Sequence, residues 1–235
     1  MNTEIDSGVQ GGLVPIVGSA QARMRTNLAL HQLLAACKAS SRLTKIEEEN
    51  AGQPLGEFWD DILHEALSVA LLTVASLEAY ANELYFENAA LSGTVPPAAT
   101  SLISELVERE SILKKYDLAM SLSCRARLGR GDSYVQNVDA LIKLRNEVVH
   151  FRPQWDGPHS KHAQFSKKLN ARFSPSPFFS DEALFPRAWA SASFASWALK
   201  STKQFIDRFC EESGIQNPTT PFATHLQVAS GGILR

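Results

Sequence analysis

Three polar residues lie close together in a segment whose other side chains are mostly apolar. Arg145, Asn146 and His150 follow one another at spacings of one and four residues. In a helix, which turns by about 100° per residue, Arg145 falls in the middle of an apolar stripe, and Asn146 and His150 share one flank of it. Because an unpaired buried guanidinium is costly, the pattern predicts an anionic partner for Arg145, beside an imidazole that can transfer protons.

This spacing resembles the R-N-x-x-x-H signature of HEPN domains (higher eukaryote and prokaryote nucleotide-binding domains). These are helical bundles, and many are metal-independent ribonucleases. An earlier segment, residues 77–83 with the sequence LEAYANE, is similar to the "LEA-aromatic-x-NE" stretch of the first core helix in several bacterial HEPN families. The resemblance covers roughly residues 58–213 and depends mainly on these two segments.

The resemblance implies cleavage of RNA by the 2′-hydroxyl of the substrate itself. That oxygen attacks the adjacent phosphorus and the 5′-oxygen leaves, which gives a 2′,3′-cyclic phosphate and a 5′-hydroxyl. His150, in the last turn of its predicted helix, is the expected acid or base. Arg145 suits the phosphate oxygens, and Asn146 can orient the phosphate or hold one histidine tautomer. The reaction requires no metal or cofactor.

One copy of the motif supplies one histidine, whereas the reaction needs both an acid and a base. The resemblance therefore implies a homodimer in which two motif faces meet. Glu78 is the only charged residue between Glu65 and Glu83, so we expect it within hydrogen-bond reach of Arg145, in the same subunit or the partner. Asn82 lies one turn further along the same face, and we expect it to support the site with Glu78.

Basic residues flank the motif on both sides, with aromatic residues among them. Phosphate neutralisation and base stacking are what a surface for single-stranded RNA requires. The alternative is a solvated loop whose aromatic side chains cover the end of the bundle. The residues expected to contact RNA are Arg125, Arg127, Arg130, Arg152, Lys161, Lys167, Lys168 and Arg172.

The composition limits other kinds of site. A net charge of −2 leaves only a local basic patch as a nucleic-acid surface. The cysteines, Cys37, Cys124 and Cys210, are widely spaced and odd in number, which favours reduced thiols over disulfides or a zinc site. A metal site at Asp60, Asp61 and His64 lacks a matching second set of ligands. His159 and His162 flank a lysine, and we expect both to be solvated.

Hydrophobic periodicity predicts helices over residues 20–49, 58–90, 100–122, 134–151 and 181–213. These indicate an all-α fold, an antiparallel bundle of about five long helices. We expect a flexible arm over 1–18 and a HEPN-like bundle over 19–213. Within the bundle, 152–180 forms a long basic and aromatic insertion with one short helix. We expect a loose C-terminal tail over 214–235.

The sequence thus favours a homodimeric, metal-independent endoribonuclease, and the family context suggests a toxin or a phage-defence effector. An antitoxin or a nucleotidyltransferase is a possible protein partner. Acidic residues near the N-terminus argue against a signal peptide, and the longest apolar run is short for a membrane span, so we expect a cytoplasmic protein. Two alternatives remain: a non-catalytic HEPN dimer that binds RNA, a nucleotide or a protein, and a structural interaction bundle.

Overall fold

The computed structural model describes residues 26–86, 95–155 and 160–234. Over these ranges the chain forms helices and no strand, so the all-α bundle predicted from the sequence is confirmed. The arm expected over 1–18 lies outside the described residues. The helices are α1 (Leu28–Glu49), α2 (Phe58–Glu83), α3 (Pro97–Glu108), α4 (Ile112–Leu122), α5 (Ser133–Val149), α6 (Lys161–Leu169), α7 (Ala192–Ser213) and α8 (Ala223–Ala229), with short helical turns at Pro177–Phe179, Leu184–Ala188 and Thr220–Phe222.

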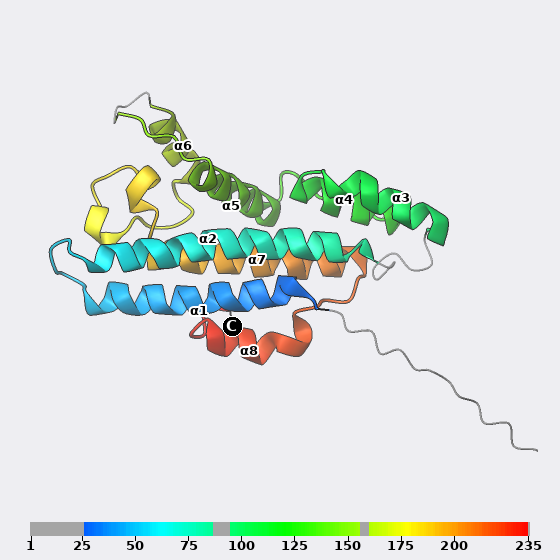
Figure 1. Cartoon of the computed structure of the whole chain (residues 1–235), viewed down its shortest axis with the longest axis horizontal. Helices are drawn as coiled ribbons and strands as arrows, with labels where there is room; N and C mark the ends of the chain where they lie inside the picture. Colours follow the sequence, from blue (N-terminus) through cyan, green and yellow to red (C-terminus); the bar gives the residue numbers. More distant parts are fainter. Residues whose placement is uncertain (1–25, 87–94, 156–159, 235) are drawn as a thin grey trace, which may run out of the picture.

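Three long helices, α1, α2 and α7, lie side by side and form the centre of the molecule (Figure 1). A carboxylate oxygen of Glu83, at the end of α2, accepts from the backbone N–H of Ala29 at the start of α1 at 3.2 Å. Glu47, near the end of α1, accepts from the N–H of Ala192 at the start of α7 at 3.1 Å. Helix α1 is therefore antiparallel to both neighbours, and α2 and α7 run in the same direction.

Helix α2 supplies much of the core. Ten of its 26 residues are buried, and they pack among α1, α5 and α7. Among the described helices it alone is long and apolar enough to cross a bilayer, a property that the core helix of a folded bundle shares. Helix α5 lies across α2 and α7 on one side, and α8 covers α1 on the other (Figure 1).

The helix predicted over 100–122 is two helices, α3 and α4. The break lies between Glu108 and Ile112, where Ser111 is extended (φ −64°, ψ 150°). Because the carbonyl of Ser111 accepts from the N–H groups of Lys114 and Lys115, a new helix starts there. The helix predicted over 58–90 ends at Glu83 in α2, and residues 87–90 lie outside the described ranges.

The last long helix begins at Ala192 and not near residue 181. Phe185, directly before Pro186, is extended (φ −108°, ψ 135°), as sterics favour for a residue that precedes proline. The hydroxyl of Ser191 then caps α7 by accepting from the N–H of Phe194 at 3.0 Å. The predicted stop at Gly214 is confirmed, since this residue adopts φ +76° at the helix end.

The C-terminal segment differs from the loose tail predicted for 214–235. It forms α8, and the side chain of Leu226 is fully buried against a small cluster that includes Leu33 and Leu199. The hydroxyl of Ser41 on α1 donates to the carbonyl of Ala229 at 2.7 Å. The glycines and prolines of this stretch predicted a loop, whereas a short helix forms between them and is held to the bundle by Leu226.

Candidate functional site

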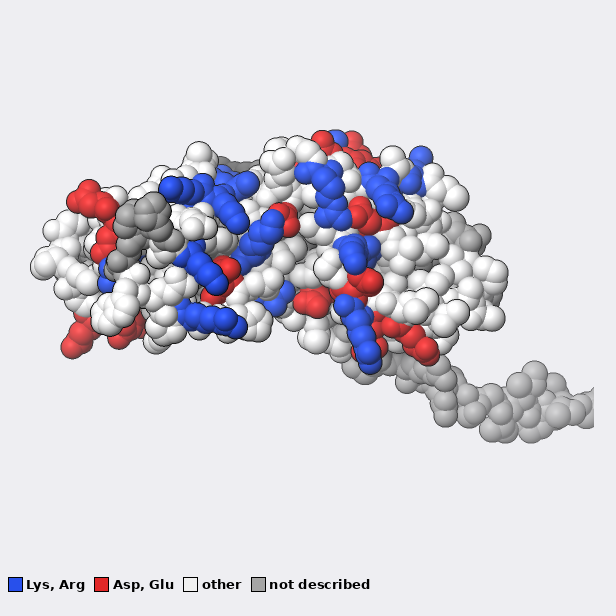
Figure 2. Space-filling view, turned by 90° about the horizontal axis from the view of Figure 1, so that it is seen from above, with Lys and Arg blue, Asp and Glu red and all other residues white. Residues whose placement is uncertain are grey.

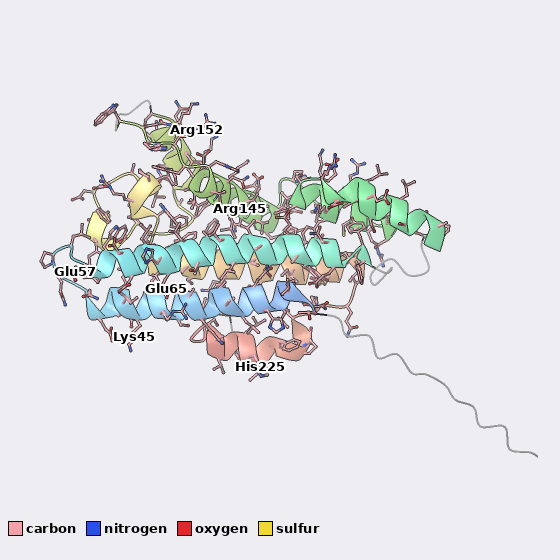
Figure 3. All side chains as sticks on the ribbon, viewed as in Figure 1. Lys45, Glu57, Glu65, Arg145, Arg152 and His225 are labelled. Carbon is pink, nitrogen blue, oxygen red and sulfur yellow. The ribbon has the colours of Figure 1, made fainter. Side chains whose placement is uncertain are left out.

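Helix α5 carries the motif and matches the predicted range of 134–151 to within two residues. Leu141 and Leu144 are fully buried, and they fix which face of α5 packs against the bundle. Arg145 lies beside them, so its guanidinium is held between α5 and α2 (Figure 3). The helix ends at Val149, three residues before the chain reaches Arg152 beyond its C-terminal end.

Arg145 forms an ion pair with Glu78 of the same chain. The distance from its Nη2 to Oε2 of Glu78 is 3.7 Å, which is an ion-pair distance but longer than a direct hydrogen bond. Glu78 of the same subunit is therefore the closest anion, as an ion pair that falls short of the predicted hydrogen-bond reach. The side chain of Glu78 is 44% exposed, so water also solvates the carboxylate.

The guanidinium of Arg145 keeps donors to spare. Its side chain is 25% exposed, yet its Nε is buried and donates to no described atom. Buried donors without an acceptor are uncommon because the lost hydration is not replaced. The exposed part of the guanidinium can therefore bind a further anion without giving up any short hydrogen bond, whereas the buried Nε is out of reach of solvent.

Asn146 and His150 are both exposed, as a site that meets a large substrate requires. The backbone N–H of His150 donates to the carbonyl of Asn146 at 2.9 Å, the last helical hydrogen bond of α5. Two apolar neighbours of the histidine are also exposed, Val149 by 50% and Phe151 by 46%. The end of α5 thus combines an accessible imidazole with an uncovered apolar surface.

Asn82 has a different role from the one predicted. Its side-chain oxygen accepts from Nζ of Lys115 at 2.7 Å, and no described contact joins it to Arg145. Lys115 is only 2% exposed, and its ammonium also donates to the carbonyl of Glu108 at 3.1 Å. Asn82 therefore joins α2 to the α3–α4 corner. Sequence reasoning missed Lys115 because nothing distinguishes it from its exposed neighbour Lys114.

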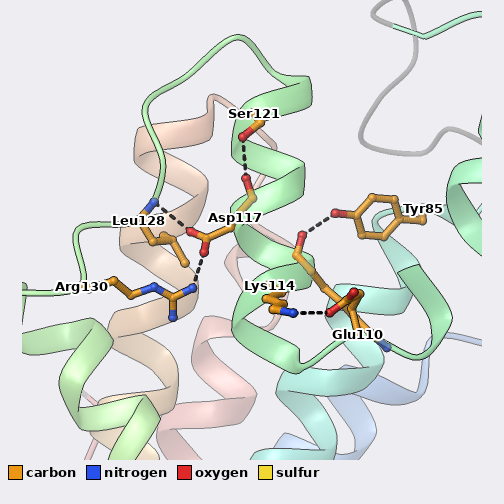
Figure 4. A network of polar contacts seen from close by, with 8 residues as sticks. Tyr85, Glu110, Lys114, Asp117, Ser121, Leu128 and Arg130 are labelled. Atoms are coloured by element: carbon orange, nitrogen blue, oxygen red, sulfur yellow. Dashed lines mark hydrogen bonds and ion pairs between the residues drawn. The ribbon is translucent and has the colours of Figure 1, made fainter. Parts of the chain in front are cut away.

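The basic residues predicted to contact RNA divide into two groups. Arg130 is tied to the carboxylate of Asp117, which also accepts from the N–H of Leu128 at 3.1 Å (Figure 4). The guanidinium of Arg172 donates to the side-chain oxygen of Asn137. These two arginines order the chain on either side of the motif. Arg130 is nevertheless exposed, and so are the remaining members of the set, Arg125, Arg127, Arg152, Lys161, Lys167 and Lys168.

The face that carries α3 to α6 has a mixed charge. Figure 2 shows many Lys and Arg side chains along it, with Asp and Glu side chains among them. Part of the positive charge is balanced locally, for example where Lys143 meets Asp139 at 2.5 Å on α5. A nucleic acid on this face would therefore meet separate cations and not a uniformly positive surface.

His162 is buried, although the sequence predicted a solvated loop residue. Its ring is stacked on that of Phe151 at 5.4 Å between centroids and lies edge-on to Phe185 at 5.0 Å. This aromatic contact attaches α6 to the residue that directly follows His150. His159 lies outside the described residues. Phe151 and Phe185 are visible in the sequence, but phenylalanines are too common for these two to predict a contact with His162.

Among the described residues, the cysteines and acidic side chains form neither a disulfide nor a metal site. Cys37 and Cys210 are buried, Cys124 is exposed, and all three are free thiols. Burial raises the pKa of the Cys37 thiol to about 12, which makes it a poor nucleophile. Within the ranges that the structure describes, no group of three His, Cys, Asp or Glu side chains is arranged to hold a metal ion.

Comparison with known proteins adds no relative: no protein-family model, curated protein or solved structure matches this chain. The fold and site together define an all-α bundle with an arginine, an amide and an imidazole at the exposed end of one helix. Its function is therefore inferred from the side chains themselves.

Proposed function

We propose that this protein is a HEPN-type, metal-independent endoribonuclease that acts as a homodimer through its motif face. The observation that carries the proposal is the last part of α5, where exposed Asn146 and His150 follow an arginine that is a quarter exposed and whose closest anion is 3.7 Å away. In the proposed reaction His150 transfers a proton and Arg145 binds the phosphate oxygens. Asn146 orients the scissile phosphate or the imidazole.

The loose ion pair of Arg145 supports a role in binding phosphate. An RNA phosphate could replace Glu78 as the closest anion, since the existing contact spans 3.7 Å and Glu78 can return to water. The fork of the guanidinium would then contact two phosphate oxygens at once, which a lysine could not do. Glu78 would hold the arginine in place between substrates.

The exposed apolar residues next to His150 support a dimer. Val149 and Phe151 would be covered if two copies met end to end at α5, and this would bring a second histidine to the same phosphate. The exposed cations Arg152, Lys167 and Lys168 would then contact the RNA on either side of the cleavage point. We propose a cytoplasmic toxin or phage-defence role, with an antitoxin or nucleotidyltransferase as a possible partner.

The test is incubation of purified protein with RNA in the presence of EDTA. The variants are His150→Ala and Arg145→Ala, and the matched control is His64→Ala, another exposed histidine. We expect the first two to lose about 100-fold or more in rate, with the control unchanged. Products should carry 2′,3′-cyclic phosphates, and RNA with a 2′-deoxy residue at the cleavage point should stay intact.

Equal cleavage by all four proteins would exclude this site as the source of activity. Sedimentation of the same samples tests the dimer, and a monomer that cleaves fully would contradict the two-fold arrangement. A second candidate is a HEPN dimer that binds RNA or a nucleotide without cleaving it. The single exposed histidine of the motif in each chain favours that reading, since cleavage needs both an acid and a base. RNA binding that needs Arg145, with no product in any sample, would support it.

A further inference from the structure

A concave site lies on the side of α2 that faces away from the motif. It is a cavity of about 280 Å³ between the start of α1, the C-terminal half of α2, α7 and the segment that follows α7. Ser76, Tyr80 and Glu83 line it from α2. At about 100° per residue, these three lie about 140–200° around the helix from Glu78, so the cavity and the motif use opposite faces of α2.

The walls of the cavity are mainly apolar. Leu30 and Leu33 of α1, Ile206 of α7 and Phe222 surround it, with Ser76 and Tyr80 supplying polar edges. An apolar cavity of about 150 Å³ is enough to bind benzene, so this one can hold a ring with a substituent. The hydroxyl of Tyr80 is already in contact with Sγ of Cys210 at 3.3 Å, which leaves it little capacity for a ligand.

The charge of the lining is negative. Glu83 contributes a half-buried carboxylate. Among the described residues that line the cavity none is a lysine or arginine, and His31 at the exposed start of α1 is the one that could carry positive charge. Oε1 of Glu83 accepts from the backbone N–H of Ala29 at 3.2 Å. A carboxylate can accept from several donors, so Glu83 can cap α1 and still bind a cation.

We propose that this cavity is a binding site for a small organic cation. The apolar body of the ligand would lie between Leu30, Leu33 and Phe222, and its amidinium or ammonium N–H groups would donate to Glu83. An organic anion would face the like charge of the carboxylate, and a neutral hydrocarbon would displace water from that carboxylate without offering it a donor. The proposal does not depend on the nuclease, because it uses other residues on another face.

The probe for the test is benzamidine, with benzoate and benzyl alcohol as anionic and neutral comparators of similar shape. Binding is measured by titration calorimetry and ligand-observed NMR on the full chain. We expect saturable binding of benzamidine that is at least about tenfold tighter than that of either comparator. Glu83→Gln keeps an acceptor for the Ala29 N–H but removes the charge, and it should weaken benzamidine by about tenfold or more.

Two further variants locate the site. Leu30→Trp should fill the cavity and abolish binding, and Glu49→Gln, an exposed acid at the far end of α1, should leave it unchanged. The proposal is overturned if benzamidine does not saturate, if benzoate binds as tightly, or if Glu83→Gln and Glu49→Gln bind alike. Circular dichroism of each variant confirms folding, and the Glu83→Gln comparison still decides the matter if Leu30→Trp does not fold.

Discussion

Two cations contact α2 at residues one turn apart, and they differ in how fully they are satisfied. Lys115 is almost completely buried, and its ammonium makes hydrogen bonds of 2.7 Å to Asn82 and 3.1 Å to the carbonyl of Glu108. Arg145 is a quarter exposed, its closest anion is Glu78 at 3.7 Å, and its Nε has no described acceptor. The two cations lie on different helices, α4 and α5, and contact neighbouring positions of one face of α2.

The difference separates a structural cation from one that is available to a ligand. Lys115 has short contacts with neutral acceptors, and these close the corner between α2, α3 and α4. Arg145 keeps a donor that the protein does not use, although burying such a group without a partner is unfavourable. The partly exposed guanidinium is where we propose that a phosphate binds, and the saturated Lys115 shows that this chain can satisfy a cation fully.

The difference between Lys115 and Arg145 should have its largest effect on the free energy of unfolding. Lys115→Ala removes a buried side chain and two hydrogen bonds, so we expect it to lower the free energy of unfolding by about 3 kcal/mol. Arg145→Ala should cost about 1 kcal/mol or less, since it loses a loose, partly exposed ion pair. Urea denaturation measures both, with the exposed Lys114→Ala as the control. Equal losses for Lys115 and Arg145 would show that both cations are structural.

Removing an acceptor on α2 should change stability in the same way as removing the cation that it binds. Asn82→Ala leaves a buried ammonium with one fewer acceptor, and we expect a loss of about 2 kcal/mol that persists at high salt. Glu78→Ala should cost under about 1 kcal/mol, and the loss should disappear by about 1 M NaCl because exposed charges are screened. Urea midpoints at low and high salt distinguish these outcomes. A salt-sensitive Asn82 effect would contradict the proposed role of Lys115.

A third polar contact, between Glu47 and the backbone N–H of Ala192 at the start of α7, should have a smaller effect on stability than those of Lys115 and Asn82. Burial raises the pKa of Glu47 above its ordinary value, although its bond from the Ala192 N–H opposes this and nearby Glu48 adds to it. The folded state therefore holds a proton that the unfolded state has already lost. Stability should fall as pH rises from the ordinary glutamate pKa through the raised one.

Comparison with Glu47→Gln tests this directly. The wild type should lose stability relative to the variant as pH rises above the ordinary glutamate pKa, by less than either substitution at Lys115 or Asn82. Urea midpoints across that range give the difference at each pH. Parallel curves for the two proteins would show that the carboxyl keeps its ordinary pKa, and that burial there is balanced by its hydrogen bond.

The sequence predicted the parts of this molecule that depend on local pattern. Apolar periodicity located the long helices. The position of Arg145 on α5 pointed to Glu78, which lies at ion-pair distance, 3.7 Å, and not within the predicted hydrogen-bond reach. Breaks that depend on a single residue were harder to place. Ser111 divides a predicted helix, and Pro186 delays the start of α7, because each acts through backbone geometry that periodicity does not record.

Contacts between distant segments could not be read from the sequence. Asn82 lies on the expected face of α2 but binds Lys115, because the corner between α3 and α4 brings a lysine closer than the motif arginine. His162 looked like a loop residue until α6 placed it against Phe151. The cavity beside Glu83 is formed by four separate segments of the chain, so no single sequence motif could predict it.

The final hydrogen bond of α5 joins Asn146 to His150, the two exposed members of the motif. Helix ends open and close locally far more often than whole proteins unfold. Each opening of that last turn releases the backbone of His150 from that of Asn146, so in the proposed site the two residues would keep their relative positions only while the turn is closed. Hydrogen–deuterium exchange at the His150 backbone amide would therefore measure how often the last turn of α5 opens in the absence of any substrate.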